Sequence, residues 1–172
     1  MDSGNNLSKI AEAFQRYRFD PIMIGNAAAA LNGAPVTTED FDFVVEQTPE
    51  NYRKIIALAS YFHCKVYELK LTNTQNYMYR LQKDDGTFFL DILHKIAGYD
   101  ELSGIRKRAT SVTFDKYSLK VAALEDILHS KKIAGRPKDL AVIPILEMTQ
   151  NEIRAQQEKQ QIQKPEKGNR LH

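Results

Sequence analysis

Two acidic residues stand inside an otherwise apolar stretch, DFDFVV, which begins at Asp40. The alternation predicts a strand in which Asp40 and Asp42 share one face, and Phe41, Phe43 and Val45 share the other. Neighbours on one face lie roughly 6–7 Å apart, so the two carboxylates repel each other unless a cation lies between them. Two interpretations stay open: a solvent-facing strand edge, or a site for one divalent cation or for two about 3.5–4 Å apart.

A third aspartate, Asp91, is the single charge in the apolar stretch TFFLDIL. A carboxylate in a buried strand is costly unless it is paired or bound to a metal. It could also bond a backbone amide or a nearby lysine at a sheet edge. If this strand and the Asp40–Asp42 strand are adjacent, the three carboxylates form an oxygen site that suits Mg²⁺ or Mn²⁺.

Gly25 and Asn26 stand where a predicted strand, residues 19–25, meets an alanine-rich predicted helix, residues 27–32. A glycine there lets a ligand approach the backbone, and the amides at a helix N-terminus attract an anion. The alternative is close packing of the helix on the sheet, which the small residues also favour.

A basic segment, KKIAGRPKD, begins at Lys131. Lys132 and Arg136 are four residues apart and present two positive groups on one helix face, and Lys138 follows beside Pro137. This pattern is typical of a solvated helix end, where cations favour the helix dipole, and equally of an anion site. Asp139 is expected to pair with Arg136.

The surrounding pattern predicts the elements that must position these residues. Apolar residues recur at helical spacing, then alternate along short strands, and Lys83 to Gly86 is a strong hairpin turn. The order predicts an α/β (α+β) fold, with a mixed, partly antiparallel sheet flanked by helices and a small helical C-terminal part. Pro144 should kink or break the last helix. Predicted helices are 7–17, 27–32, 49–62, 124–134 and one from 137, and predicted strands are 19–25, 41–46, 65–71, 76–82, 87–93, 111–114 and 117–121.

Length and composition set outer bounds. The 172 residues suit one domain over residues 1–150, with a helical part at 123–150, followed at 151–172 by a polar helix that frays into a disordered tail after about residue 163. A net charge of +2 neither demands nor excludes nucleic acid. With Cys64 as the only cysteine, no internal disulfide forms and a reducing cytoplasm is expected. Neither a membrane span nor a secretory signal is expected.

The residues Gly25-Asn26, a spacer of thirteen, and then Asp40-Phe41-Asp42 resemble the signature of the DNA polymerase beta-like nucleotidyltransferase superfamily. Asp91 matches the third acid of that signature. The segment 119–140 is similar to the corresponding part of small bacterial members, which include the minimal nucleotidyltransferases and the abortive-infection toxin-type enzymes. The resemblance covers about residues 19–146.

The resemblance implies a metal-dependent nucleotidyltransferase, which moves a nucleoside monophosphate from a nucleoside triphosphate (NTP) to an acceptor hydroxyl. Asp40 and Asp42 would hold two Mg²⁺ or Mn²⁺ ions, and Asp91 would share the ion that activates the acceptor. Lys132 is the expected partner of the triphosphate. The residues that match nucleotide-binding positions, or lie beside them, are Gly25, Asn26, Thr38, Lys132, Arg136 and Lys138.

Three positions depart from the family pattern: Asn26 replaces a second Gly or Ser, Val36 replaces an Arg, and Val142 replaces an Asp. The sequence leaves the acceptor open among RNA, a protein hydroxyl and a small molecule. It also leaves open a toxin or antitoxin role and association with a partner protein or a second copy. The alternative function is a non-catalytic nucleotide-binding or protein-interaction module on the same fold.

Overall fold

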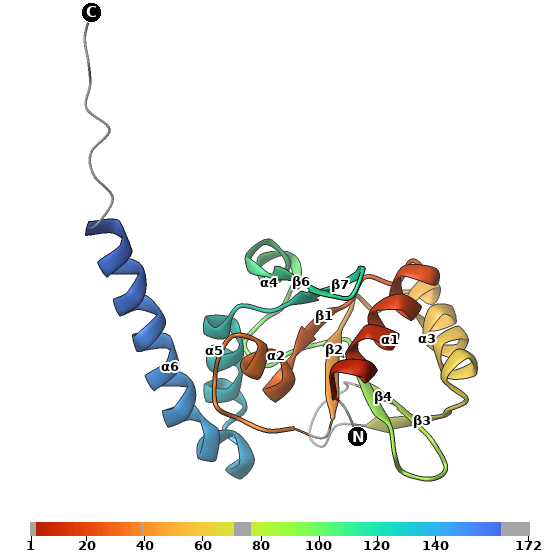
Figure 1. Ribbon diagram of the computed structural model, residues 1–172. Helices are drawn as coiled ribbons and strands as arrows, with labels where there is room; N and C mark the ends of the chain where they lie inside the picture. The colour runs from red at the N-terminus through yellow and green to blue at the C-terminus, as the bar shows by residue number, and fades with distance from the viewer. Residues whose placement is uncertain (1–2, 39, 71–76, 163–172) are drawn as a thin grey trace, which may run out of the picture.

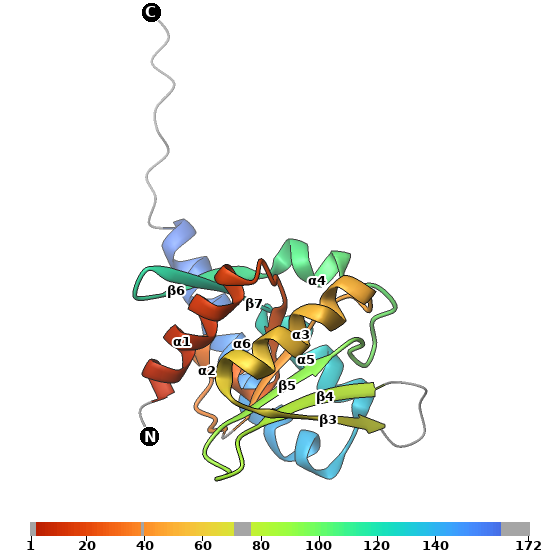
Figure 2. The ribbon, with the colours of Figure 1, turned by 90° about the vertical axis from the view of Figure 1, so that its right-hand side faces the viewer.

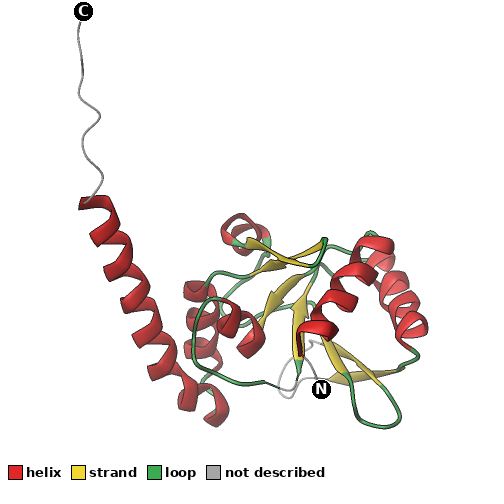
Figure 3. Cartoon of the chain, viewed as in Figure 1, coloured by secondary structure: helices red, strands yellow, loops and turns green. Residues whose placement is uncertain are grey.

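The computed structural model describes residues 3–38, 40–70 and 77–162 of the chain. A seven-stranded mixed sheet, in the order β3-β4-β5-β2-β1-β7-β6, forms the centre of the molecule (Figure 3). The pairs β2–β5 and β1–β7 are parallel and the other four are antiparallel. The strands are β1 (Ile22–Ile24), β2 (Phe41–Val44), β3 (Lys65–Lys70), β4 (Tyr77–Gln82), β5 (Phe89–Leu93), β6 (Thr110–Phe114) and β7 (Tyr117–Val121).

Helices cover both faces of this sheet. Figures 1 and 2 show α1 and α3 on one face, with α2, α5 and α6 on the other. The sheet and its helices therefore form three layers. The helices are α1 (Ser3–Arg16), α2 (Gly25–Leu31), α3 (Pro49–Phe62), α4 (Ser103–Arg108), α5 (Leu124–Ala134) and α6 (Pro137–Ile162).

The core lies between α1, α3 and the middle of the sheet. Phe14 of α1 packs edge-to-face on Phe43 of β2, with 4.9 Å between ring centroids, and on Phe19 at 5.2 Å. Phe41, Phe43 and Val45 are all buried, as the alternation predicted. Because their face is committed to the core, Asp42 must point to the opposite face.

Local signals fix the boundaries of α3. Thr48 caps its first turn by accepting a hydrogen bond from the backbone N–H of Asn51, and Pro49 takes the first helical position. The predicted ranges 49–62 and 124–134 are those of α3 and α5. The strand predicted at 19–25 shortens to β1 because Gly25 already belongs to α2. The short helix α4 was not predicted, since its six residues are too few to show a helical period.

Of the two effects expected at Pro144, a break in the last helix does not occur, because α6 runs continuously from Pro137 to Ile162. Proline removes only the hydrogen bond to the carbonyl of Leu140, a residue 56% exposed, where water can replace it. Buried Leu146 and Asp139 hold the helix on both sides of the proline.

The C-terminal part of α6 leads away from the body of the molecule (Figure 1). Every residue from Arg154 to Ile162 is exposed. The disordered tail expected after about residue 163 lies outside the described residues. No helix in the described ranges is both long and apolar enough to cross a membrane.

Candidate active site at the Asp42–Asp91 strand pair

The sheet register brings the predicted acids together. Asp42 of β2 lies directly opposite Asp91 of β5 in the parallel pair, and Ile24, the last residue of β1, lies opposite Asp42 on its other side. Residues opposite each other in a ladder point to the same face, so both carboxylates leave the sheet on the side away from α1 and α3. The strand adjacency on which the three-carboxylate interpretation depended is therefore present.

Gly25 forms one wall of this site. Its φ of +71° is a conformation that side chains rarely adopt, and a Cβ built there would lie 2.3 Å from Oδ2 of Asp42. Both facts require glycine at the point where β1 turns into α2. The backbone thus approaches the Asp42 carboxylate more closely than any other residue type would allow.

Arg80 of β4 is the site residue that sequence reasoning missed. It lies opposite Asp91 in the antiparallel ladder and donates from Nε and Nη2 to the two Asp91 carboxylate oxygens, at 2.8 and 2.6 Å. Nη2 also lies 3.7 Å from Oδ2 of Asp40. Of the alternatives considered for Asp91, a nearby cation is the one observed, although it is an arginine and not a lysine.

Asp42 carries the strongest electrostatic strain of the group. Burial, and then the charges of Asp91 and Asp40, raise the pKa of Asp42 to about 6, while Lys138 and Lys131 act in the opposite direction. No hydrogen bond or ion pair to the Asp42 carboxylate is found within the described ranges. The chain therefore brings three carboxylates together and supplies one guanidinium, which is directed at the other two.

Two further predicted residues lie beside the acids. The hydroxyl of Thr38 donates to the Asp40 carbonyl at 2.9 Å and accepts from the Asp40 N–H, so it shapes the turn that leads into β2. Oδ1 of Asn26 is buried and finds no donor among the described residues. A buried amide oxygen without a partner is unfavourable, and a ligand N–H or hydroxyl would satisfy it.

The basic segment divides into two sides. Lys131 lies in the electrostatic field of Asp42, as does Lys138, and it contacts buried Asp139 at 3.3 Å. Lys132, the residue expected to face a triphosphate, instead forms an ion pair with Glu147 of α6 at 2.6 Å. Arg136 donates to Asp139 from Nε at 2.5 Å, which confirms the predicted pairing of those two residues.

The carboxylate oxygens of these acids are ligands that suit a divalent cation, but the side chains do not surround a single point. Within the described ranges no three acidic, histidine or cysteine side chains form a ready-made metal cage. The guanidinium of Arg80 lies among the acids and bridges Asp91 and Asp40. Such a cation would bind the hard carboxylate oxygens, offset the excess of negative charge and lower the raised pKa of Asp42.

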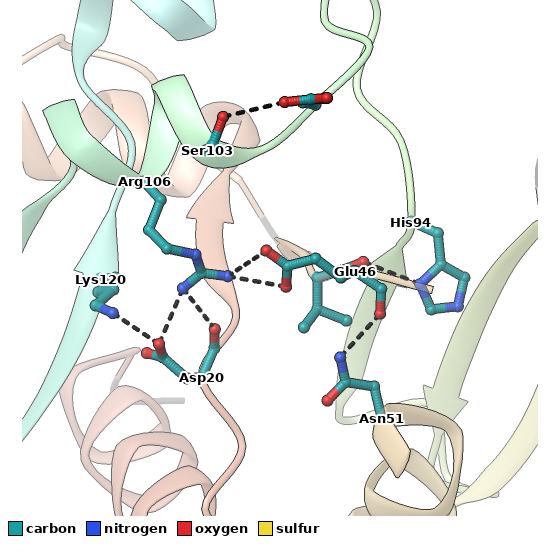
Figure 4. Close-up of polar contacts among 9 residues, drawn as sticks. Asp20, Glu46, Asn51, His94, Ser103, Arg106 and Lys120 are labelled. Atoms are coloured by element: carbon teal, nitrogen blue, oxygen red, sulfur yellow. Dashed lines mark hydrogen bonds and ion pairs between the residues drawn. The ribbon is translucent and has the colours of Figure 1, made fainter. Parts of the chain in front are cut away.

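The opposite end of the same strands holds a different arrangement (Figure 4). Arg106 of α4 bonds both carboxylate oxygens of Glu46 at 3.0 Å and Oδ2 of Asp20 at 2.9 Å, and Lys120 bonds Asp20 at 2.7 Å. Glu46 and Arg106 also border a cavity of about 470 Å³. Glu46 follows Asp42 by four residues, so the two ends are about 13 Å apart along the strand.

His94 belongs to this second end. Its Nδ1 bonds the Val45 carbonyl at 3.0 Å, and its ring packs edge-on against Tyr79. It follows the strand that carries Asp91 but lies beyond that strand's far end.

No family model and no curated protein matches the sequence. Solved structures do match the fold. A "putative nucleotidyltransferase" of Thermotoga maritima superposes with a TM-score of 0.61 at 20% identity, over 86% of this chain and 92% of that one. The lincosamide antibiotic adenylyltransferase LnuA, solved with lincomycin bound, gives 0.55 at 15% identity, over 86% and 96%. The chain has the nucleotidyltransferase fold.

This nucleotidyltransferase fold places β2 and β5 side by side near the middle of the sheet, with β1 beyond β2. The expected mixed sheet flanked by helices is confirmed. Asp42 lies near the start of β2, opposite Asp91 and against Gly25, and the charges of Lys131 in α5 and Lys138 in α6 act on Asp42.

Proposed function

We propose that this protein transfers a nucleoside monophosphate from an NTP to an acceptor hydroxyl, with divalent metal ions. The observation that carries the proposal is the direct pairing of Asp42 and Asp91 on adjacent strands, with the backbone of Gly25 against the Asp42 carboxylate. Two carboxylates paired in this way, with Asp91 buried, are retained at a cost in stability, which a structural role alone would not favour.

In this proposal Asp40, Asp42 and Asp91 are the metal ligands. When bound, the metal ions would neutralise charge on the phosphates and lower the pKa of the acceptor hydroxyl. The acceptor oxygen forms a bond to the α-phosphorus, the bond from that phosphorus to the bridging oxygen breaks, and pyrophosphate leaves with the electron pair. In this proposal Asp91 would face the acceptor and receive the hydroxyl proton.

Gly25, Asn26 and Thr38 would border the phosphates. Gly25 contributes close backbone approach, and Asn26 contributes an amide oxygen that finds no donor in the part of the chain that the structure describes. Thr38 orders the Asp40 turn and so acts as a positioning residue.

The cationic side of the phosphate site is better supplied by Lys131 and Lys138 than by Lys132. The first two already act on the charge of Asp42, whereas Lys132 is half exposed and paired with Glu147. Arg136 is committed to buried Asp139 and would hold the α5–α6 junction in place. The triphosphate contact predicted for Lys132 is therefore reassigned in this proposal to its neighbour.

The test is incubation of the purified protein with Mg²⁺ and each NTP in turn, together with candidate RNA, protein and small-molecule acceptors, followed by mass spectrometry. The expected result is an acceptor heavier by one nucleoside monophosphate, with one pyrophosphate released per transfer. Nucleotide binding without any transfer, for all acceptors and NTPs, would contradict the proposal.

One observation favours the alternative of a non-catalytic nucleotide-binding module. Arg80 occupies both oxygens of Asp91, and in that state this carboxylate is unavailable to a metal ion. A module of this kind would bind an NTP with equal affinity in the presence and absence of Mg²⁺, whereas the enzyme requires the metal for transfer.

A further inference from the structure

One part of the sheet face that carries Asp91 is left open. Side chains of β3, β4 and β5 that point to this side form a surface beside the carboxylates, here called the open face. Tyr67 and Leu69 of β3 are 43% and 39% exposed, although both are large apolar residues. The members of the open face that matter here are Tyr67, Leu69, Met78, Gln82 and Phe89.

The open face leads directly to the proposed site. Tyr67 lies opposite Arg80, Arg80 opposite Asp91, and Asp91 opposite Asp42, so the four form one straight row across the sheet. With about 4.8 Å between strands, Tyr67 stands roughly 10 Å from Asp91 along this row. A molecule of that length resting on Tyr67 would reach the Asp91 carboxylate.

On the opposite side of the sheet, α3 packs against part of these strands (Figure 2). Tyr79 of β4 contacts Tyr52 of α3, with 5.5 Å between ring centroids, and Leu81 is fully buried. Packing beneath α3 therefore explains Tyr79 and Leu81 on that side of β4. It does not explain Tyr67 and Leu69, which a stable edge strand would more often replace by polar residues.

The charges of the open face are already neutralised. Arg80 is paired with Asp91, and its guanidinium lies 5.4 Å from the centre of the Phe89 ring. Lys65, the other cation at this side of β3 and β4, is paired with Asp84 at 2.8 Å. A nucleic acid strand needs cations free to contact its phosphates, so this surface suits an uncharged molecule better.

We propose that the open face binds the acceptor, and that the acceptor is a neutral small molecule with an apolar or aromatic body and a free hydroxyl. This inference rests on the proposed nucleotidyl transfer and names its substrate class. The body packs on Tyr67 and Leu69, and the hydroxyl lies at Asp91. The hydroxyl oxygen bonds to the α-phosphorus, its proton passes to the Asp91 carboxylate, and pyrophosphate departs with the electrons of the broken bond.

The test uses the full-length protein, Mg²⁺ and each NTP labelled at the α-phosphate, supplied with three fractions of a cell extract: small molecules, RNA and protein. The label is expected in the small-molecule fraction. Tyr67→Ala should then raise the KM for the labelled acceptor roughly ten-fold, because loss of one packed ring is an effect of that order. Tyr77→Ala is the matched control, since Tyr77 is similarly exposed at 36% but lies on the α3 side of β4.

Calorimetric titration with a non-hydrolysable NTP and Mg²⁺ distinguishes failure of the acceptor inference from failure of the proposed nucleotidyl transfer. Wild-type, Tyr67→Ala and Tyr77→Ala proteins should bind the nucleotide equally. Label in RNA or protein, no labelled small molecule, or an equal rise in KM for both variants would overturn the inference while nucleotide binding persists. A wild-type protein that binds no nucleotide would overturn the proposed function, and this inference with it.

Discussion

Two charged clusters stand at opposite ends of the same central strands, and they differ in their charge balance. The Arg106 cluster holds two carboxylates, of Asp20 and Glu46, against two cations, Arg106 and Lys120. The Arg80 cluster holds three carboxylates, of Asp40, Asp42 and Asp91, against the single guanidinium of Arg80.

The two clusters also differ in exposure. Asp20 and Glu46 have side chains 62% and 50% exposed, so water shares in their stabilisation. In the Arg80 cluster the Asp40 side chain is also solvated, at 43% exposed, but that of Asp91 is 4% exposed, and burial is the first cause of the raised pKa of Asp42. A solvated cluster with balanced charge stabilises the contact between strands and helices. A partly buried cluster with an excess of negative charge favours the binding of an added cation. This difference is why the proposed function is placed at the Arg80 cluster.

The largest expected effect is on transfer. Asp42→Asn removes the central carboxylate and should lower the rate of nucleotide transfer by about a thousand-fold or more, because metal-based charge stabilisation supplies several kcal/mol. Glu46→Gln, at the balanced cluster, should leave the rate unchanged. The rate of pyrophosphate release measures both, and equal losses would remove the distinction between the clusters.

The same substitution should stabilise the metal-free protein. Because the pKa of folded Asp42, about 6, lies above its ordinary value of 3.8, the folded state favours the protonated form and loses stability as the pH rises through 6. Relief of this strain by Asp42→Asn corresponds to an upper bound on the order of 3 kcal/mol above pH 7 and should disappear near pH 4. Denaturant unfolding in a chelator, measured at both pH values, checks the sign.

The substitution Gly25→Ala should displace the Asp42 carboxylate without removing it. Because the new Cβ would meet Oδ2 of Asp42 at 2.3 Å, that carboxylate must shift. A shift of about 1 Å can lower the rate about a hundred-fold. Gly33→Ala is the matched control: Gly33 also has a positive φ, but a Cβ there meets no atom within 4 Å. A similar rate loss in both variants would assign the effect to backbone strain.

Removal of the two arginines compares the clusters directly. Arg80→Ala leaves buried Asp91 without its partner and should cost about 3–5 kcal/mol of unfolding free energy, whereas Arg106→Ala should cost roughly 1–2 kcal/mol because its partners stay in water. Saturating Mn²⁺ should restore part of the Arg80→Ala loss by taking the place of the guanidinium, and none of the Arg106→Ala loss. Unfolding with and without Mn²⁺ measures this, and equal recovery would count against a metal site at Asp91.

The smallest expected effect distinguishes neighbouring lysines. Lys131→Ala should weaken NTP binding about ten-fold, the size of one charge-assisted contact, while Lys132→Ala should change it little because Lys132 is paired with Glu147. Calorimetry at fixed salt measures both. Equal weakening would describe a diffuse basic patch, and the reverse order would restore the role first assigned to Lys132.

Much of the arrangement follows from the sequence because it is local. The alternation of DFDFVV sets which face Asp42 uses, and Gly25 marks the end of β1. The partner of Asp91 could not be predicted from the local sequence, because it depends on the register of the β4–β5 hairpin. Asp85 accepts from both the N–H and the hydroxyl of Thr87, which extends the turn beyond Gly86 and shifts the pairing to Arg80–Asp91. A turn that ended at Gly86 would have paired Arg80 with Phe89.

The contacts of Lys131 and Lys132 also depend on residues distant from them in the sequence. The spacing of Lys132 and Arg136 suggested one basic face on α5, but the helix ends at Gly135 and α6 folds back beside it. That return brings Asp139 to Lys131 and Glu147 to Lys132. Packing of α6 on α5, which no periodicity in the sequence specifies, therefore decides which carboxylate each lysine contacts.

The central claim is that the unbalanced cluster binds a divalent cation. Calorimetric titration of Mn²⁺ into the nucleotide-free wild-type protein, above the pKa of Asp42, tests this claim, with Asp42→Asn and Glu46→Gln as parallel samples. We expect saturable Mn²⁺ binding to the wild-type and Glu46→Gln proteins and loss of that binding in Asp42→Asn. Binding of equal strength in all three, or in none, would contradict it.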